Sequence, residues 1–246
     1  MSILRKIKGK VRSLFRRKKT TEPAAAYDIW ASSYDRQKDN PIAYLNSLVF
    51  NDILDALDLD GKTIIDVGCG TGSNWEKILS KRPYKIIGYD VSSEMLGRLH
   101  QKYPQATTFL LHDNALNGSW DLSCDMVVST LVVGYIKDLP AALAEWNRVL
   151  KRGGEIIITD FHPVALQGGG NRSFTHEEKV VYIKNYVHSL HKIKALANKM
   201  NWQEIDLIER KVDESIKFFF EEQHVLHVYE KEFGSPILYG WRFRKG

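Results

Sequence analysis

The sequence contains little cysteine and no long uninterrupted hydrophobic run. Its two cysteines, Cys69 and Cys124, are too few for a disulfide framework and lack the spacing of a zinc site. The longest apolar stretch, residues 126–136, is broken by two hydroxyl residues and a glycine, and it is much shorter than the roughly 20 residues that span a bilayer. These absences exclude a disulfide-stapled scaffold and a transmembrane protein, and they favour a cytoplasmic protein.

Acidic residues are absent from the first 20 positions, which hold nine of the 35 lysines and arginines. The remaining residues carry 26 basic and 30 acidic side chains, so a mildly acidic body follows a basic arm. Apolar residues recur in the arm at three- and four-residue steps, which predicts an amphipathic helix. Such a helix could lie on an anionic membrane, contact nucleic acid phosphates, act as a mitochondrial presequence or form a solubilising tail. We favour peripheral attachment to an anionic membrane surface.

The length of 246 residues and the hydrophobic content of 43% are typical of one domain with a sizeable core. We therefore divide the chain into a basic amphipathic arm, residues 1–22, and a single folded domain, residues 23–246. Cap elements are expected in the domain at residues 23–57 and 162–190.

Strand-like runs alternate with helix-like segments through most of this domain. Strands are predicted at residues 62–67, 84–90, 107–112, 124–130, 155–161, 203–212 and 236–244. Helices are predicted near residues 27–35, 42–57, 72–81, 92–102, 139–151 and 189–201. The alternation predicts a Rossmann-like α/β fold, with a seven-stranded, mostly parallel sheet, an antiparallel last strand and helices on both faces.

Three other segments are harder to assign. Thr20 to Pro23 and the three alanines that follow are typical of a linker. Residues 161–172 are rich in proline and glycine, which predicts a mobile loop. The period-two alternation from Val225 to Tyr229 is compatible with an additional strand.

A glycine-rich turn directly after the first predicted strand is the most informative segment. Gly68, Gly70 and Gly72 let the backbone approach a ligand closely, because glycine has no Cβ and tolerates positive φ. The next strand ends in Asp90, whose carboxylate can accept both hydroxyls of a ribose. Asp113 follows the third strand, where an adenine amino group would lie. Because the carboxyl ends of parallel strands meet at one edge, these residues predict a site for an adenosine-containing ligand.

Each of these side chains also has a structural interpretation. Asp66, two residues before the first glycine, could cap the glycine turn, and Asp90 could begin the following helix. Asp113 could be a turn residue. An aromatic residue such as Tyr34, on an N-terminal helix, could serve packing alone.

The sequence resembles the class I S-adenosylmethionine-dependent methyltransferases, and specifically their small-molecule branch, which includes ubiquinone and menaquinone biosynthesis enzymes. The resemblance covers residues 24–161. It rests on Tyr27-Asp28 through Tyr34-Asp35, Asp66-Val67-Gly68-Cys69-Gly70-Thr71-Gly72, Tyr89-Asp90-Val91-Ser92, His112-Asp113 and Val149-Leu150-Lys151-Arg152-Gly153-Gly154.

This resemblance implies S-adenosylmethionine as the cofactor and implies which residues bind it. The residues of the glycine turn would line the methionine moiety: Gly68, Cys69, Gly70 and Gly72. The next two strand ends would bind the ribose through Asp90 with Val91, and would border the adenine through Asp113 with Asn114 or Ala115. The methionine amine and carboxylate would be met by Asp66, by Ser129 or Thr130, and by Tyr34.

The cofactor brings its own electrophile, so the protein must mainly align an acceptor for in-line displacement and exclude water. We expect a small, apolar or aromatic acceptor and O- or C-methylation. His162 and His188 are the candidates for a base or an acceptor-orienting group, although either could equally be structural. Gly168 to Gly170, with Arg172, could form a lid or a surface loop.

Nucleic acid is not the expected acceptor. Residues 129–132, Ser-Thr-Leu-Val, lack the Asp/Asn-Pro-Pro-Tyr/Phe turn that presents an amine for methylation. No metal is expected either, because Glu221, Glu222, His224 and His227 have no recognisable metal spacing. The alternatives are an RNA methyltransferase that uses the arm as a phosphate tether, a non-catalytic S-adenosylmethionine-binding protein and a nucleotide-binding oxidoreductase.

Overall fold

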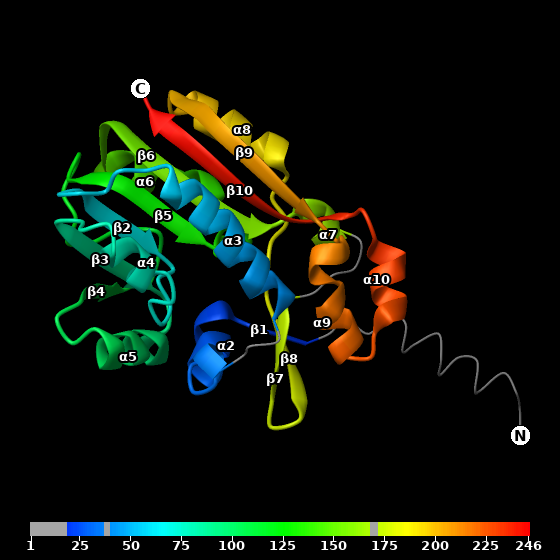
Figure 1. The fold of residues 1–246 in the computed structure, drawn as a ribbon. Coiled ribbons are helices and arrows are strands. Elements are labelled where there is room, and N and C mark those ends of the chain that lie inside the picture. Colours follow the sequence, from blue (N-terminus) through cyan, green and yellow to red (C-terminus); the bar gives the residue numbers. More distant parts are fainter. Residues whose placement is uncertain (1–18, 37–39, 168–171) are drawn as a thin grey trace, which may run out of the picture.

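The structure, a computed structural model, describes residues 19–36, 40–167 and 172–246. Its centre is a seven-stranded sheet in the order β4-β3-β2-β5-β6-β10-β9 (Figure 1). β10 is antiparallel to both of its neighbours and the other pairs are parallel, which confirms the predicted arrangement. The strands are β2 (Thr63–Val67), β3 (Lys85–Asp90), β4 (Thr107–Leu110), β5 (Cys124–Thr130), β6 (Leu150–Phe161), β9 (Trp202–Lys211) and β10 (Pro236–Lys245).

Helices cover both faces of this sheet, as the sequence predicts. One core lies between the sheet and α3 (Pro41–Asp55), α4 (Trp75–Leu79) and α5 (Ser93–Lys102). The other core lies beneath α6 (Leu139–Val149) and α8 (Leu190–Lys199). Successive strand residues point to opposite faces, so Ile64 belongs to the first core and Ile65 to the second. Burial on both faces explains the consecutive apolar residues Ile64 and Ile65 in β2 and residues 126–128 in β5.

Capping residues begin the helices at the predicted places. The Asn40 side chain accepts hydrogen bonds from the amides of Ile42 and Ala43, at 3.0 and 3.2 Å, and Pro41 occupies the first turn of α3. Ser189 caps α8 by accepting from the Lys192 amide at 3.2 Å. These caps satisfy amides that would otherwise have no partner in the helix.

A smaller sheet and a helix lie beside the main sheet (Figure 1). Its strands are β1 (Thr20–Thr21), β8 (Lys179–Ile183) and β7 (Ser173–His176), and α2 (Pro23–Trp30) packs on them. The Trp30 ring stacks on Phe174, with centroids 4.4 Å apart. This sheet was not predicted from the sequence. Because Thr20 and Thr21 pair with β8, the folded body begins before residue 22, where the sequence placed the end of the arm.

Other segments also differ from the sequence predictions. The alanines after Pro23 lie inside α2 and not in a linker. Residues expected to form a mobile loop include α7 (Pro163–Gln167), where proline is tolerated in the first helical turn. The alternation from Val225 to Tyr229, which was compatible with an additional strand, falls instead in helix α10 (Leu226–Glu232). Tyr229 packs there on Phe220, with the ring centroids 5.7 Å apart. η3 (Glu214–Ile216) and α9 (Lys217–Glu222) precede α10.

Two predicted features lie outside the described residues. These are the amphipathic helix of the basic arm, of which residues 1–18 are not described, and Gly168 to Gly170 of the expected lid. None of the helices in the described part of the chain combines the length and the apolar character that crossing a bilayer requires.

Gly240 of β10 provides a test of how closely α3 packs on the sheet. A Cβ at this position would lie 2.2 Å from Val49 Cγ1 of α3. We expect Gly240→Ala to lower the free energy of unfolding by about 1–3 kcal/mol, because α3 would have to move away. Urea denaturation measures this change.

Gly97→Ala is the matched control, because a Cβ at Gly97 in α5 would meet nothing within 4 Å. Alanine is the better helix former by about 1 kcal/mol, so this variant should be at least as stable as the wild type. Equal losses in the two variants would contradict the close packing of α3 on Gly240.

Candidate active site

The candidate site lies where the direction of sheet extension reverses. β3 and β4 extend the sheet on one side of β2, whereas β5 and β6 extend it on the other. The connections that follow the strands at this position lead to opposite sides of β2, and this divergence opens a crevice at the carboxyl ends of the strands. A cavity of about 460 Å³, the first cavity, lies there. Its lining includes Gly68, Gly70, Asp90, Asp113 and Thr130.

The glycine turn after β2 packs tightly against the loop after β5. Gly68 has a φ of +74°, and a Cβ on it would lie 2.1 Å from Val132 Cγ2. The amides of Gly68 and Cys69 both donate to the Tyr89 carbonyl, at 2.6 and 3.1 Å. A larger residue at position 68 would therefore push the two loops apart and change the floor of the first cavity. Glycine is required here for a steric reason as well as a conformational one.

Asp90 ties this turn to the end of β3. Its Oδ2 accepts from the Gly70 amide at 2.8 Å and its Oδ1 from the Ser92 amide at 2.9 Å. Each carboxylate oxygen keeps a further lone pair, and Asp90 lines the first cavity. Burial raises the pKa of Asp90 to about 6, although these amide bonds oppose the rise. Ser92, and not Asp90, caps α5, so Asp90 remains available to a ligand.

Asp66 has a structural position behind the turn. Its Oδ2 accepts from the Trp75 indole at 2.8 Å, which fixes α4 beneath the glycine turn. Burial raises the pKa of Asp66 to about 7, and its Oδ1 has no partner among the described residues. The Asp66 side chain lines neither the first cavity nor the second cavity described below. This placement favours a structural role for Asp66, as an anchor for Trp75 and not as a cap of the glycine turn.

The far end of the first cavity is formed after β3 and β4. Val91, Asp113 and Asn114 line it, whereas Ala115 does not. Asp113 Oδ1 accepts from the Ala115 amide at 2.8 Å, so Asp113 is a turn residue and a cavity residue at the same time. Asn114 lies against the start of α6, with its Nδ2 3.5 Å from the Asp138 carbonyl.

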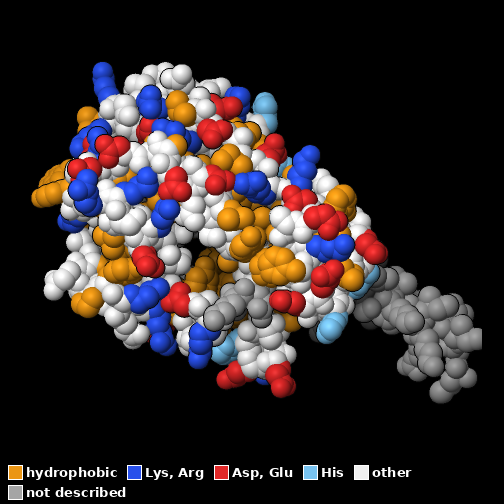
Figure 2. Space-filling view, viewed as in Figure 1, with side chains coloured by type: hydrophobic (Ala, Val, Ile, Leu, Met, Phe, Trp, Pro, Cys, Tyr) orange, Lys and Arg blue, Asp and Glu red, His pale blue; other side chains and the backbone are white. Residues whose placement is uncertain are grey.

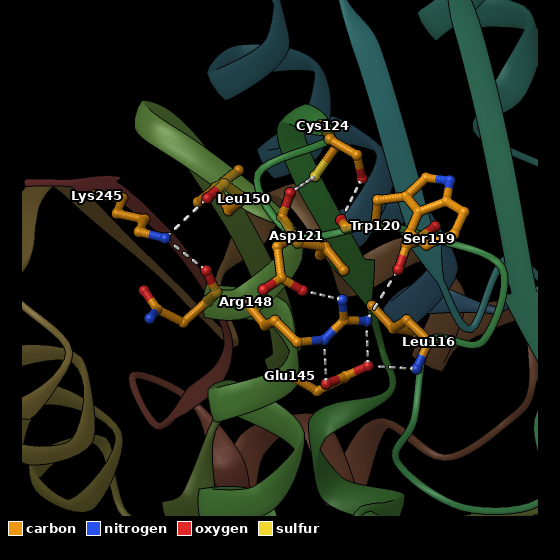
Figure 3. Close-up of polar contacts among 12 residues, drawn as sticks. Leu116, Ser119, Trp120, Asp121, Cys124, Glu145, Arg148, Leu150 and Lys245 are labelled. Carbon is orange, nitrogen blue, oxygen red and sulfur yellow. Dashed lines mark hydrogen bonds and ion pairs between the residues drawn. The ribbon is translucent and has the colours of Figure 1, made fainter.

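A polar network holds the loop that continues from this end (Figure 3). The Arg148 guanidinium donates to Glu145 at 2.7 and 2.8 Å, and to Asp121 at 2.6 Å. Glu145 Oε1 also accepts from the Leu116 amide at 2.8 Å, and Arg148 donates to the Ser119 carbonyl at 3.1 Å. Residues 116–121 are thereby held on α6, directly after Asp113 and Asn114. Arg148 directly precedes the motif Val149 to Gly154 on which the resemblance rests in part, but it is not one of the motif residues.

The remaining cofactor candidates are divided between the cavities and the core. Thr130 lines both cavities, and its hydroxyl accepts from Asn74 Nδ2 at 3.0 Å. Ser129 is fully buried and lines neither cavity. Gly72 packs against Leu99 and lines neither. Of the two neighbours Ser129 and Thr130, the structure therefore places only Thr130 at the site.

A second cavity of about 470 Å³ adjoins the first. Figure 2 shows a hollow on this face with hydrophobic side chains inside it, in the region where α2 and α3 lie. Cys69 faces the second cavity and not the first, and burial raises the pKa of its thiol well above the usual range. The two cavities share a wall that consists of Tyr27, Tyr34, Gly68, Gly70, Thr130, Leu131 and Tyr135.

Aromatic side chains dominate this shared wall. The Tyr27 hydroxyl donates to the Tyr135 hydroxyl at 3.1 Å, and Tyr135 belongs to η2 (Val133–Tyr135). Tyr34, in η1 (Tyr34–Arg36), packs edge-on against Trp30 with centroids 5.0 Å apart. Burial raises the pKa of the Tyr34 phenol, so it stays neutral at physiological pH. Tyr34 therefore has a packing role and also faces both cavities.

A buried ion pair that the sequence did not predict joins the elements around the second cavity. Arg172 forms a hydrogen-bonded ion pair with Asp160 at the end of β6, and both side chains are almost completely buried. Asp160 also accepts from the Gly134 amide at 2.6 Å, and Arg172 donates to the Leu131 carbonyl at 3.1 Å. The guanidinium lies 4.5 Å from the Tyr135 ring centroid. The pair thus joins β6, the loop after β5 and the segment before β7.

His162 and His188 do not lie at the two cavities, which corrects the expectation that either acts there as a base. His162 directs Nε2 to Glu209 of β9, at 2.9 Å, and its Nδ1 accepts from the Val164 amide at 3.3 Å. His188 Nε2 donates to the Ile136 carbonyl at 2.8 Å, and burial lowers its pKa. Neither histidine lines either cavity. Both side chains are held by structural partners.

Within residues 19–36, 40–167 and 172–246, no cluster of three or more histidine, cysteine or acidic side chains is arranged to hold a metal ion.

Comparison with known proteins agrees with this geometry. Residues 65–158 match the family model described as "Methyltransferase domain". A malonyl-[acyl-carrier protein] O-methyltransferase from Serratia marcescens is 34% identical over 111 residues, which cover 45% of this chain and 43% of that protein. The curated relatives that match first are covered over 30% to 55% of their own length.

Solved structures show the same fold. The [4+2]-cyclase SpnF has a TM-score of 0.66 at 16% identity, with 92% of this chain and 96% of that chain covered. The N-methyltransferase NodS from Bradyrhizobium japonicum, in complex with S-adenosyl-L-homocysteine, has a TM-score of 0.63 at 14% identity, with 92% and 99% covered.

The reversed sheet order, the close glycine turn and the buried acid at the end of β3 define a class I methyltransferase fold. Residues 65–158 are similar to the methyltransferase domain family, and this similarity supports S-adenosylmethionine as the cofactor.

Asp90 provides a direct test of the first cavity. Asp90→Asn should weaken binding of S-adenosylhomocysteine by about tenfold or more, because an amide cannot accept hydrogen bonds at both of its terminal atoms. The wild type should also bind S-adenosylhomocysteine more weakly as the pH falls below about 6, because the Asp90 carboxylate is then protonated and binding requires its ionised form. Calorimetric titration from about pH 8 to about pH 5 measures both effects.

The asparagine variant should lose this pH dependence. Asp206→Asn, at an exposed position on β9, is the matched control and should retain wild-type affinity. If Asp90→Asn binds as tightly as the wild type at every pH, Asp90 does not hold the ligand.

Proposed function

We propose that this chain transfers a methyl group from S-adenosylmethionine to a small acceptor molecule, with S-adenosylhomocysteine as the second product. The observation that supports this proposal most directly is the pair of adjoining cavities. The first is lined by Asp90, the candidate for ribose binding, and by the glycine turn, and the second has a volume suited to a small molecule. A donor and an acceptor in adjoining cavities can react without a large movement of the chain.

The residues of the first cavity fit the cofactor. When bound, S-adenosylmethionine supplies an activated methyl group on a positively charged sulfur. Asp90 would accept the ribose hydroxyls with the lone pairs that its two amide bonds leave free. Gly68 leaves the turn open where a Cβ would collide with Val132. Tyr27 and Tyr34 would shield the reacting atoms from water. Exclusion of water keeps the nucleophilic atom of the acceptor from being hydrated and so less reactive.

We further propose an oxygen or carbon atom of a small, apolar or aromatic molecule as the methyl acceptor. Leu131, Phe161 and Ile183 provide apolar surface in the second cavity. The Serratia marcescens relative is named as an O-methyltransferase and NodS as an N-methyltransferase, so experiment must identify the acceptor atom.

Thermal unfolding separates this proposal from an oxidoreductase. S-adenosylhomocysteine should raise the unfolding temperature, because a ligand that binds only the folded state stabilises it, whereas NAD should leave it unchanged. Stabilisation by NAD alone would contradict the proposal.

Transfer itself is tested with S-adenosylmethionine carrying a labelled methyl group and with separated small-molecule, RNA and protein fractions of a cell extract. Label should enter the small-molecule fraction with the wild type and not with Asp90→Asn. Label confined to RNA would instead favour the RNA methyltransferase. Binding of S-adenosylhomocysteine without transfer to any fraction would favour a non-catalytic protein.

We also propose that the basic arm brings the domain to an anionic membrane surface. The nine cations of residues 1–20 and their apolar stripe are suited to anionic lipid headgroups. Because Thr20 and Thr21 pair with β8, the deletion that tests this should remove residues 1–18 only. The deletion should abolish sedimentation with phosphatidylserine vesicles and leave S-adenosylhomocysteine binding unchanged. Undiminished sedimentation would contradict the membrane proposal.

A further inference from the structure

We propose that the second cavity binds an acceptor that carries an oxyanion, a carboxylate or an acidic phenolate, and that Asn46 and Tyr135 hold this group beside Arg172. This inference rests on the proposed function and concerns its substrate class. Two unpaired hydrogen-bond donors and the charge of the residues that line the second cavity support it.

The Asn46 side chain of α3 presents an amide nitrogen without a partner among the described residues. Asn46 is 6% exposed and lines the second cavity. Its Oδ1 accepts a hydrogen bond from the fully buried Thr159 hydroxyl of β6, which fixes the orientation of the amide. No hydrogen bond joins Nδ2 to a described residue, and Nδ2 is not among the completely buried unpaired atoms. The remaining direction for its two N–H groups is the cavity.

Tyr135 presents a second donor. A hydroxyl can donate one hydrogen bond and accept two. Tyr27 already donates to the Tyr135 oxygen, so the Tyr135 proton is available to another acceptor. Because Tyr135 lines both cavities, an oxygen held by this hydroxyl would lie where the second cavity adjoins the first.

The charges around the second cavity also favour an anion. Arg172 lines this cavity, whereas its counter-ion Asp160 does not. Asp160 lies behind the guanidinium and also accepts from the amides of Gly134 and Phe161, at 2.6 and 2.7 Å. Arg172 Nε is buried without a partner among the described residues. The cavity is therefore exposed to the positive member of the pair.

Among the described residues that line the second cavity, Asp35 is the one acid, and its charge is already paired. Asp35, at the rim, forms an ion pair with Lys102 at 3.0 Å and accepts from the Thr71 hydroxyl at 2.6 Å. An ammonium group in this cavity would meet amide and hydroxyl donors and a guanidinium. An oxyanion would be attracted by the cation and could accept from both donors.

Binding of size-matched probes to the protein saturated with S-adenosylhomocysteine tests the inference. Benzoate represents a carboxylate, 4-nitrophenolate a phenolate, benzylamine a cation and benzyl alcohol a neutral molecule. Calorimetric titration should show that benzoate, 4-nitrophenolate or both bind more tightly than benzyl alcohol, and that benzylamine binds most weakly. Comparison of the two affinities then shows whether the second cavity prefers a carboxylate or a phenolate.

Two variants test the named donors. Asn46→Asp should weaken oxyanion binding by about tenfold or more, because it replaces two N–H donors with negative charge. Tyr135→Phe should weaken it by about tenfold through loss of one hydrogen bond to a charged group. Asn46→Asp should not change the affinity for S-adenosylhomocysteine more than about twofold, because Asn46 lines only the second cavity. Because Tyr135 lines both cavities, oxyanion binding by Tyr135→Phe is compared with the wild type at saturating S-adenosylhomocysteine. If buried charge prevents Asn46→Asp from folding, Tyr135→Phe alone decides the result.

Asn51→Asp on the same helix and Tyr44→Phe are matched controls, since neither residue lines either cavity. Both controls should bind the oxyanion probes like the wild type. The inference is overturned if benzylamine binds as tightly as the oxyanions, if no oxyanion binds at millimolar concentration, or if the two cavity variants match their controls. Failure of the wild type to bind S-adenosylhomocysteine would contradict the proposed function and not this inference. The preference among the probes would then be measured with the protein alone.

Discussion

The structure depends on one close approach, between the glycine turn after β2 and the loop after β5. At position 68 there is no room for a Cβ, since it would overlap Val132. This contact brings the ends of two neighbouring strands together at the point where the sheet reverses direction. The Asp90 carboxylate then holds the turn through the Gly70 amide and keeps lone pairs toward the first cavity. A steric requirement and one charge-assisted hydrogen bond thus shape the first cavity.

The second cavity is built differently. Its walls come from α3, the end of β6, the loop after β5 and the segment before β7, and Arg172 with Asp160 joins three of them. A buried ion pair stabilises a protein little unless its hydrogen bonds are satisfied, but removing one partner leaves an uncompensated charge. The pair is therefore best understood as a positional constraint on Tyr135 and Leu131. This constraint also leaves a cation facing the second cavity.

Sequence patterns predicted the main sheet well because its strands are buried on both faces and separated by amphipathic helices. Ile64 and Ile65 illustrate this, since both are fully buried in opposite cores. The smaller sheet of β1, β7 and β8 was not predicted because its strands are short and partly exposed. Its stability comes from tertiary contacts such as the stacking of Trp30 on Phe174. Local hydrophobic periodicity carries no signal for contacts of that kind.

The sequence by itself determined the Rossmann-like order of elements, the glycine turn and the place of Asp90, because these depend on local spacing and on strand ends that must meet. Only the tertiary structure decided which neighbouring polar residues face a ligand. It turned Thr130 toward the cavities and Ser129 into the core, and it directed His162 to Glu209. It also brought Asn46 and Arg172 to one cavity from distant parts of the chain. Side-chain direction and long-range pairing follow from packing, which a linear pattern does not encode.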